Sequence, residues 1–285
     1  MLATASLDEL RAAVREARAA GKRIGCVPTM GALHAGHLSL MRSALNETDY
    51  VVVTIFVNPT QFGPNEDFDR YPRQLDKDLE LCRGLGVHCV FHPDVQTMYP
   101  PDDATIVEVQ GLSTILEGEH RPGHFRGVTT VVTKLFHAVQ PDVAFFGQKD
   151  FQQQLILRRM VRDLLMPIRI RTCPTVRDPD GLALSSRNAY LTADERRTAL
   201  NISRALFRAR EAIESGELSV AEAEKRLVQV LSSVPGLKLD YAVIRNAETL
   251  DPAENTGDQL VGLVAARVGT TRLIDNVLIS PPGTA

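Results

Sequence analysis

The sequence predicts an α/β fold: a doubly wound, mostly parallel sheet followed by a smaller C-terminal α+β domain. Apolar, β-branched runs alternate with helical patterns through the first part of the chain, as in sheets whose strands are buried on both faces. The alternation stops near residue 177, after which two long helical patterns precede three strand-like runs. We therefore expect one domain over residues 1–176 and a second over residues 177–285.

The N-terminal elements follow from local patterns. Ser6 is expected to cap a helix over residues 7–20, with Glu9 completing an S-x-x-E box. An apolar strand over residues 24–27 should end at Pro28, because proline cannot donate to a central ladder. A glycine-punctuated turn over 29–36 and a helix over 37–46 follow.

The next strand ends in a polar loop. Residues 51–57 form an almost continuous β-branched run, which stops at Asn58 and Pro59. Residues 60–63 then form a loop at the carboxyl end of the strand, where open α/β sheets bind ligands. Gly147 ends a later apolar run in the same way, so three turns should share one edge of the sheet.

The remaining elements are expected from periodicity and from glycine and proline positions. The predicted helices are 72–84 (ended by Gly84 and Gly86), 128–139, 151–164, 192–215 and 219–234. The predicted strands are 87–91, 105–109, 143–146, 168–173, 239–244, 259–268 and 271–279. Asp275 and Asn276 in the last strand are interpreted as structural residues.

Composition favours a cytoplasmic protein without nucleic-acid or membrane partners. The net charge is -3, from 32 basic and 35 acidic residues, so no basic field attracts nucleic acid. No apolar run approaches the length of a membrane span, and the N-terminus has no signal-peptide core. The four cysteines form no C-x-x-C pair, which is typical of reduced, structural thiols.

The turn over residues 29–36 allows several interpretations. Gly31 and Gly36 mimic the spacing of a phosphate-binding P-loop, but His37 and Leu38 stand where that loop needs Lys and Ser or Thr. A zinc site using His34 and His37 lacks a third protein ligand nearby. The histidines could simply cap the helix, or they could donate to nucleotide phosphates beside exposed backbone N–H groups and the helix dipole.

Four short sequence blocks, the first of which contains this turn, occur in order along the chain. The order VPTMGALHAGH, IFVNPTQF, FFGQKDFQQ and LSSRN resembles the pantothenate synthetase (pantoate–β-alanine ligase) family over essentially the whole chain. The turn itself resembles the HxGH turn of the nucleotidyltransferase superfamily. The resemblance implies a Rossmann-like fold of nucleotidyltransferase type and an ATP-dependent reaction with Mg²⁺. Pantoate would be adenylated with release of pyrophosphate, and β-alanine would then displace AMP to give pantothenate.

The resemblance also implies site residues. The catalytic residues would be His34, His37, Lys149 and Arg187. ATP would contact Met30, Gly31, Ala32, Leu33, His34, Ala35, Gly36, His37, Gly147, Gln148, Lys149, Asp150, Val176, Leu184, Ser185, Ser186 and Arg187. Gln61 and Gln153 would bind pantoate, and Gln61 would also contact β-alanine. Protein metal ligands are not expected, because Mg²⁺ would arrive with ATP.

Some positions remain open at this level. Gln148 stands where many family members carry glutamate, so its side chain is given no role of its own. Arg121 and His124 match a family stretch near the active site but could equally cap the following helix. The resemblance implies a homodimer and a C-terminal lid that carries residues 184–187.

Two other functions compete with the ligase. Another HxGH nucleotidyltransferase would transfer a nucleotide and stop there, but Gln61, Gln153 and the C-terminal domain argue against it. A non-catalytic nucleotide sensor on the same fold would be indicated by loss of Lys149, His37 or Arg187, all of which are present.

Overall fold

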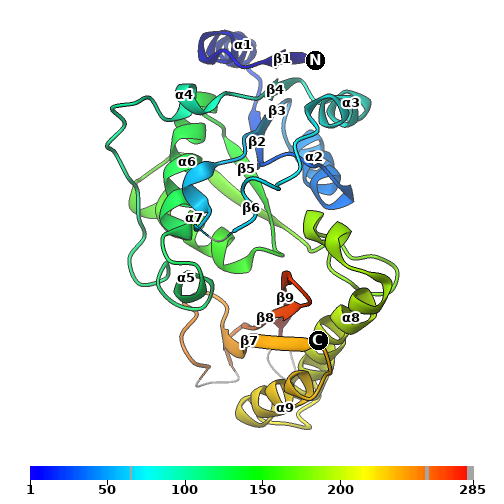
Figure 1. Cartoon of the computed structure of the whole chain (residues 1–285). Helices are drawn as coiled ribbons and strands as arrows, with labels where there is room; N and C mark the ends of the chain where they lie inside the picture. The colour runs from blue at the N-terminus through cyan, green and yellow to red at the C-terminus, as the bar shows by residue number, and fades with distance from the viewer. Residues whose placement is uncertain (65, 254–256, 281–285) are drawn as a thin grey trace. The chain divides into compact units, whose positions relative to one another are not determined.

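A computed structural model of the chain describes residues 1–64, 66–253 and 257–280 (Figure 1). The chain divides into two compact units, which we describe separately. The first unit comprises Met1–Gln148 and Gln152–Pro174, and the second comprises Lys149–Phe151 and Thr175–Ala285. The expected assignment of separate functions to residues 1–176 and 177–285 stays a prediction.

The first unit is built on a parallel sheet, as the sequence predicts. Its strands in the described part of the chain are β1 (Leu2–Thr4), β2 (Ile24–Thr29), β3 (Tyr50–Ile55), β4 (Cys89–Phe91), β5 (Val143–Gly147) and β6 (Arg169–Cys173). They lie in the order β1-β4-β3-β2-β5-β6, and every neighbouring pair is parallel. The central strands are buried along most of their length, as their continuous apolar sequences require.

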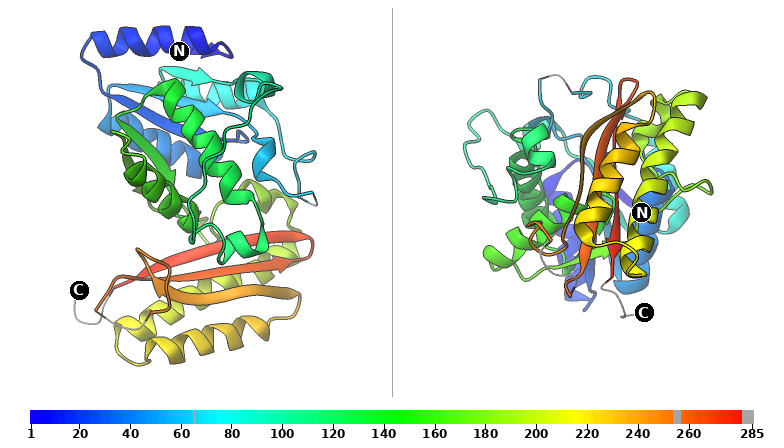
Figure 2. Two further views of the ribbon diagram at one scale, coloured as in Figure 1. Left: turned by 90° about the vertical axis from the view of Figure 1, so that its left-hand side faces the viewer. Right: turned by 90° about the horizontal axis from the view of Figure 1, so that it is seen from below.

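Helices cover both faces of this sheet (Figures 1 and 2). One face carries α1 (Leu7–Ala19), α6 (His124–Val139) and α7 (Phe151–Asp163), and the other carries α2 (Ala35–Glu47) and α3 (Leu75–Leu85). The shorter helices are η1 (Pro59–Gln61), α4 (Val95–Met98) and α5 (Glu117–His120). The chain leaves β2 towards one face and β5 towards the other. The neighbouring strands β2 and β5 therefore flank the topological switch point of the sheet.

Strand β2 differs from the prediction at its end. Pro28 does not end the strand, because β2 continues to Thr29 with Pro28 opposite Thr54 of β3. The ladder to β5 covers only Gly25 and Cys26, so it has ended before the missing N–H of Pro28.

The N-terminus also corrects the sequence analysis. Ser6 caps α1 through its hydroxyl, but the expected capping box is incomplete. The Glu9 carboxylate accepts from Thr4 Oγ1, and the Ser6 N–H donates to Thr4 Oγ1 instead. The short strand β1 beside β4 is not predicted, because three residues are too few to show a period.

The predicted strand over residues 105–109 is wrong. No described residue of that segment lies in a strand. Its backbone is bound by side chains of α6, since the Val107 N–H donates to Thr130 Oγ1 at 3.0 Å and the Val107 carbonyl accepts from Thr129. Hydroxyl groups thus replace the ladder that the sequence suggests.

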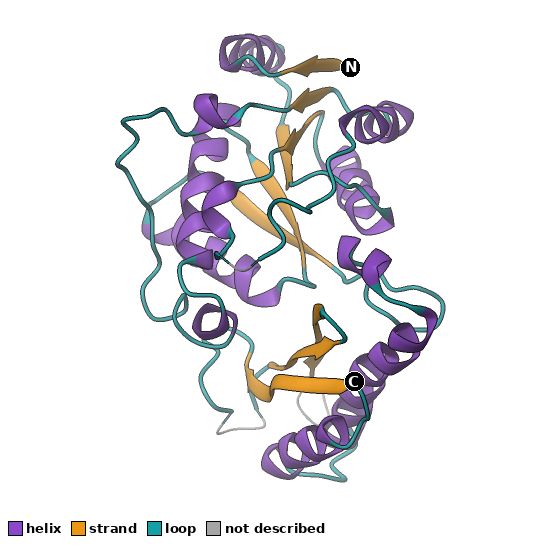
Figure 3. Ribbon diagram, in the orientation of Figure 1, coloured by secondary structure: helices purple, strands orange, loops and turns teal. Residues whose placement is uncertain are grey.

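The second unit is an antiparallel sheet with helices, which confirms the α+β prediction. It contains η2 (Ser186–Tyr190), α8 (Ala193–Glu214), α9 (Val220–Ser232), β7 (Leu237–Asn246), β8 (Leu260–Val268) and β9 (Thr271–Ile279). The strand order is β7-β8-β9, and α8 and α9 pack side by side on this sheet (Figure 3). Complete capping boxes at Thr192 and Ser219 begin the two long helices at the predicted positions.

The described cysteines are free and buried, and burial raises the pKa of Cys82 to about 12 and that of Cys89 to about 11. Over the described residues, the helices are too short or too polar to cross a membrane.

Candidate active site

Three predicted site segments share the carboxyl edge of the first sheet. Strands β3, β2 and β5 are neighbours and parallel, so the turn after β2, the helix η1 after β3 and residues Gly147 and Gln148 after β5 lie at one edge. The switch point between β2 and β5 opens on the same edge, which is where doubly wound sheets bind their ligands.

The turn after β2 is held by a carboxylate within the protein. Gly31 and Ala32 both have left-handed backbone, with φ of 80° and 51°. The N–H groups of Ala32 and Leu33 each donate to the buried carboxylate of Asp78 on α3, at 2.9 Å. A Cβ on Gly31 would lie 3.0 Å from Asp78 Oδ2, so glycine also leaves room for this contact.

This finding corrects the expected use of the turn. The N–H groups of Ala32 and Leu33 are bonded to Asp78, and that of Gly31 donates to Thr29 Oγ1 at 3.1 Å. These three groups therefore shape the turn and do not face a bound phosphate. The charge that stabilises a ligand must come mainly from side chains and from the N-terminus of α2.

His34 and His37 form a capping box at the start of α2. His34 Nδ1 accepts from the Gly36 N–H at 3.2 Å, and His37 Nδ1 accepts from the His34 N–H at 3.3 Å. Their ring centroids are 4.1 Å apart. The capping interpretation is thus confirmed, and it also defines the tautomer: each neutral ring carries its proton on Nε2. Capping and donation to a ligand therefore use different nitrogens of the same ring.

Gln61 is buried at the end of η1, with both ends of its amide bound. Asn58 Nδ2 donates to Gln61 Oε1 at 3.1 Å, and Gln61 Nε2 donates to Met30 Sδ at 3.1 Å. The same Asn58 amide also donates to the Gly127 carbonyl of α6 at 3.1 Å. These contacts link the turn after β2 to the loop after β3.

Arg121 and His124 support the Gln61 backbone from α5 and α6. Arg121 pairs with Glu66 at 2.6 Å, and its Nη1 donates to His124 Nε2 at 3.0 Å. His124 Nδ1 then donates to the Gln61 carbonyl at 2.8 Å. The helix-cap interpretation is wrong, since Gly123 is the N-cap of α6 and makes no side-chain cap bond. Both residues contact the loop that carries Gln61.

The three consecutive glutamines of α7 have different environments. Gln152 is buried and donates to the carbonyls of Leu112 and Ile115. Gln154 is also buried, and its Oε1 accepts from Thr172 at 2.9 Å. Gln153 is half-buried and makes no side-chain hydrogen bond within the described part of the chain. Of the three, Gln153 has the amide that is available to a ligand.

The other predicted ATP residues belong to the second unit. Lys149 is half-buried and Asp150 is exposed, directly after β5. Val176 and Leu184 face each other in a small hairpin, where the Leu184 N–H donates to the Val176 carbonyl at 3.0 Å. Ser185 caps η2 by accepting from the Arg187 N–H at 3.3 Å.

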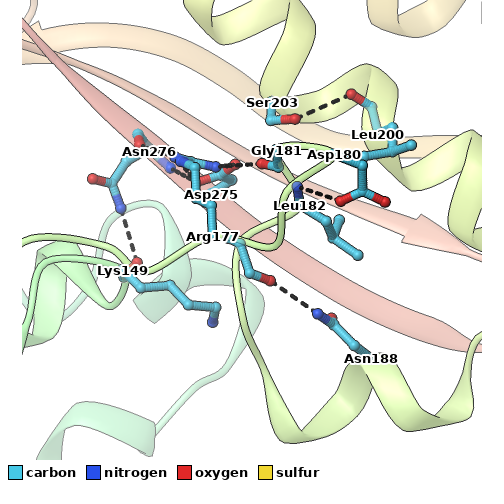
Figure 4. A network of polar contacts seen from close by, with 11 residues as sticks. Lys149, Arg177, Asp180, Gly181, Leu182, Asn188, Leu200, Ser203, Asp275 and Asn276 are labelled. Atoms are coloured by element: carbon cyan, nitrogen blue, oxygen red, sulfur yellow. Dashed lines mark hydrogen bonds and ion pairs between the residues drawn. The ribbon is translucent and has the colours of Figure 1, made fainter. Parts of the chain in front are cut away.

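The Lys149 ammonium makes no ion pair with any described residue. Figure 4 shows its side chain extending away from Asn276, which binds the Lys149 carbonyl. The structure thus brings the predicted residues together as two groups, one in each compact unit. The group in the first unit consists of Met30, Gly31, Ala32, Leu33, His34, Ala35, Gly36, His37, Gln61, Gly147, Gln148 and Gln153. The group in the second unit consists of Lys149, Asp150, Val176, Leu184, Ser185, Ser186 and Arg187.

Sequence reasoning gave no site role to several residues that shape these groups. In the sequence, Asp78 has the appearance of an ordinary surface acid on a helix. In the structure it is buried. Gly127 lies inside a helical pattern, where a glycine signals close packing but does not identify its partner. Among the described residues, no group of three or more His, Cys, Asp and Glu side chains could hold a metal ion.

Comparison with known proteins agrees with this arrangement. The family model described as pantoate–β-alanine ligase matches residues 3–278. The pantothenate synthetase of Moorella thermoacetica is 54% identical over 274 residues, covering 96% of this chain and 97% of the relative. That of Pelotomaculum thermopropionicum is 50% identical over 279 residues, covering 98% and 99%.

Solved structures agree as well. The crystal structure of pantothenate synthetase from Thermus thermophilus matches with a TM-score of 0.94 and 48% identity, covering 99% of this chain and 100% of the other. The pantoate–β-alanine ligase from Francisella tularensis, complexed with β-γ ATP and β-alanine, matches with a TM-score of 0.79 and 35% identity, covering 98% and 97%. Sequence, fold and family model agree, and the chain belongs to the pantoate–β-alanine ligase family.

Proposed function

We propose that this chain joins pantoate to β-alanine in two steps through a pantoyl-adenylate intermediate. The overall ATP-dependent ligation follows from family membership over nearly the whole chain. A carboxylate resists attack by an amine because its carbon is shielded by negative charge and oxide is a poor leaving group. Adenylation overcomes this by supplying AMP as the leaving group.

In the first step, a pantoate carboxylate oxygen attacks the α-phosphorus of ATP. A new P–O bond forms, and the bond to pyrophosphate breaks. Two anions must approach each other, so the site needs fixed positive charge. A cation 4 Å from a phosphate oxygen contributes on the order of 4 kcal/mol at an effective dielectric constant of 20. We assign this role to Lys149 and Arg187, aided by the N-terminus of α2.

His34 and His37 would contribute as neutral donors. Because their Nδ1 atoms accept backbone N–H groups, Nε2–H is the group that each neutral ring can present to a phosphate oxygen. We assign phosphate binding to both and give no separate acid role to either. Gly147, Gln148, Asp150, Val176, Leu184, Ser185 and Ser186 are proposed to line the nucleotide site with them.

Pantoate would be held by neutral amides. Gln61 and Gln153 can offer both donors and acceptors to the hydroxyl and carboxylate groups of pantoate without adding charge. Gln61 already binds Asn58 and Met30, so its orientation is set before a ligand arrives. Gln153 lies on α7, and no described residue hydrogen-bonds its amide.

In the second step, the β-alanine amine attacks the acyl carbon and AMP leaves with the bridging oxygen. The amine must be neutral, and roughly a thousandth of it is neutral at pH 7 for a lysine-like pKa. The Francisella relative was solved with β-alanine bound, and we propose that Gln61 contacts β-alanine here.

Further features belong to the same proposal. We propose that Mg²⁺ accompanies the ATP phosphates and neutralises part of their charge. We propose a cytoplasmic homodimer, supported by resemblance to the family. The second unit would act as a lid through the segment that carries Leu184 and Arg187.

One observation supports this proposal most directly. The residues of the first unit that the family resemblance implies lie together at the carboxyl edge of the sheet, beside the switch point between β2 and β5. The first test is pyrophosphate release by the purified protein with Mg-ATP and pantoate, with and without β-alanine. We expect release that requires pantoate, and AMP with pantothenate when β-alanine is added. ATP binding without release would favour a nucleotide sensor, and release with another acceptor alone would favour a different nucleotidyltransferase.

The same assay separates Gln153 from its neighbours. Gln153→Leu should raise the KM for pantoate about tenfold to a hundredfold, since a hydrogen bond to a charged group contributes about 1.5–3 kcal/mol. Its stability to urea should remain unchanged. The matched control Gln154→Leu removes the buried bond to Thr172 and should cost about 1 kcal/mol of stability while preserving the KM. An unchanged pantoate KM in Gln153→Leu would remove this residue from the site.

A further inference from the structure

Strand β9 carries two adjacent polar residues, Asp275 and Asn276, that bind the two segments on which the second group of site residues lies. Asn276 is buried, and its Nδ2 donates to the Lys149 carbonyl at 2.9 Å (Figure 4). Lys149 and Asn276 are 127 positions apart in the sequence but belong to the same compact unit. This bond fixes the backbone of Lys149 just where its side chain begins.

Asp275 holds the segment that leads to Arg187, the second of the two proposed phosphate-binding cations. Its carboxylate accepts two hydrogen bonds from the Arg177 guanidinium, at 2.7 and 2.8 Å. Arg177 also donates to the carbonyls of Gly181 and Asn276, both at 3.1 Å. Because Arg177 and Gly181 lie in the hairpin between Val176 and Leu184, this ion pair attaches the base of the segment to β9.

The segment is closed by one more bond. Asn188 Nδ2 donates to the Ala183 carbonyl at 2.9 Å, on the far side of Leu184, Ser185, Ser186 and Arg187 (Figure 4). The four predicted ATP residues therefore form a short loop whose two ends are tied together. Its orientation depends on the hairpin, which Arg177 and Asp275 hold to β9 and which Arg196 of α8 holds through Asp178 and Asp180.

The Arg177–Asp275 ion pair contributes little to the stability of the fold for the solvation that it loses. The Arg177 and Asp275 side chains are only 16% and 6% exposed, and the Arg177 guanidinium lies 4.9 Å from the ring centroid of Phe207. Charges buried in this way lose solvation, and a well-packed apolar pair often stabilises as much or more. What the pair offers instead is a fixed bidentate geometry. That property suits positioning.

We propose that Asp275 and Asn276 are positioning residues for adenylation. Asn276 fixes Lys149, and Asp275 acts through Arg177 to fix the loop that carries Arg187. Two neighbouring residues of one strand thus set the relative placement of two phosphate-binding cations. The inference deepens the proposed function, because it rests on the roles assigned there to Lys149 and Arg187.

The test compares Asn276→Leu with Lys149→Met in pantoate-dependent pyrophosphate release. Asn276→Leu keeps the side-chain size but removes the donor, and a misplaced catalytic group can cost up to about a hundredfold in rate. We expect kcat to fall about tenfold or more, with the KM for pantoate within about twofold of the wild type, because pantoate is assigned to the first unit.

A double variant distinguishes positioning from general destabilisation. If Asn276 acts through Lys149, Asn276→Leu should cause little further loss in the Lys149→Met background. The control Asp240→Asn removes an ion pair with Arg272 at 2.7 Å in the same sheet, and neither residue bonds Lys149 or Arg177 in the contacts described above. It should lower the urea midpoint while leaving kcat within about twofold. Should Asn276→Leu not fold, Asn276→Ser keeps a polar group that is too short to reach the Lys149 carbonyl.

The outcomes separate the two hypotheses. Loss of rate in Lys149→Met but not in either Asn276 variant would overturn the positioning role alone. Full activity in Lys149→Met would instead remove Lys149 from the proposed function. Equal and additive losses from Asn276→Leu in both backgrounds would assign Asn276 to stability and overturn the inference.

Discussion

His124 shows how a single side chain is fixed in one protonation state. Its Nδ1–H donates to the Gln61 carbonyl while its Nε2 accepts from Arg121, so a proton taken up at Nε2 would cost the bond from Arg121. Burial and, after it, the neighbouring Arg121 guanidinium lower the pKa of His124 to about 4, although the backbone bond to Gln61 and the carboxylates of Glu66 and Glu117 act in the opposite direction. The neutral ring thus connects Arg121 to the loop that carries Gln61 through two hydrogen bonds.

The His124 pKa predicts a pH dependence of stability. The ordinary histidine pKa is 6.5 and the folded value is about 4, so between these values the unfolded chain binds more protons. Stability from this group is complete above pH 6.5 and is lost as the pH falls toward 4, by about 3 kcal/mol in all. His124→Asn keeps the donor to Gln61 but does not titrate.

Urea unfolding at pH 7 and pH 4.5 checks this. The wild type should lose about 2–3 kcal/mol relative to His124→Asn between these pH values. Other titrating groups are common to both proteins and cancel in the difference. A difference in unfolding free energy that stays constant with pH would show that His124 is not held neutral.

At the level of elements, close packing between α6 and η1 positions the loop that carries Gln61. A Cβ on Gly127 would lie 2.4 Å from the Thr60 carbonyl oxygen and 2.7 Å from the Gln61 nitrogen. These are backbone atoms that cannot rotate away. Only glycine allows α6 to approach the loop closely enough for Asn58 to reach the Gly127 carbonyl.

Gly127→Ala should therefore displace the loop. We expect a loss of about 1–3 kcal/mol in stability and a rise of about tenfold or more in the KM for pantoate. The matched control is Gly84→Ala in α3, where a Cβ would meet nothing within 4 Å. That change should stabilise the protein by up to about 1 kcal/mol and leave the KM unaltered. A wild-type pantoate KM in Gly127→Ala would contradict the loop's role.

The helices and strands, and the edge of the sheet at which the site residues lie, could be predicted from the sequence because they depend on local patterns. The buried runs of β2, β3 and β5 and the caps of α8 and α9 are all readable over a few residues. The supports of the site could not be predicted, since they join residues far apart in the chain. Asp78 reaches Ala32 across 46 positions, and Asn276 reaches Lys149 across 127. The turn's N–H groups were misassigned for the same reason.

On the scale of the whole molecule, the proposed reaction uses groups from both compact units. In this proposal the first unit would supply neutral amides and imidazoles, and the second would supply Lys149 and Arg187. This division matches the chemistry. A cation beside pantoate would pair with the carboxylate that has to attack phosphorus. The charge on the phosphate oxygens, in contrast, needs cations to stabilise it. The adenylate intermediate is the central claim, because every assigned role depends on it.

Isotope transfer tests that claim most directly. Pantoate labelled with ¹⁸O in its carboxylate is incubated with the protein, Mg-ATP and β-alanine, and AMP and pyrophosphate are analysed by mass spectrometry. Attack on the α-phosphorus followed by cleavage of the acyl C–O bond predicts one ¹⁸O atom in each AMP and none in pyrophosphate. Label in pyrophosphate, or unlabelled AMP, would contradict a pantoyl-adenylate intermediate.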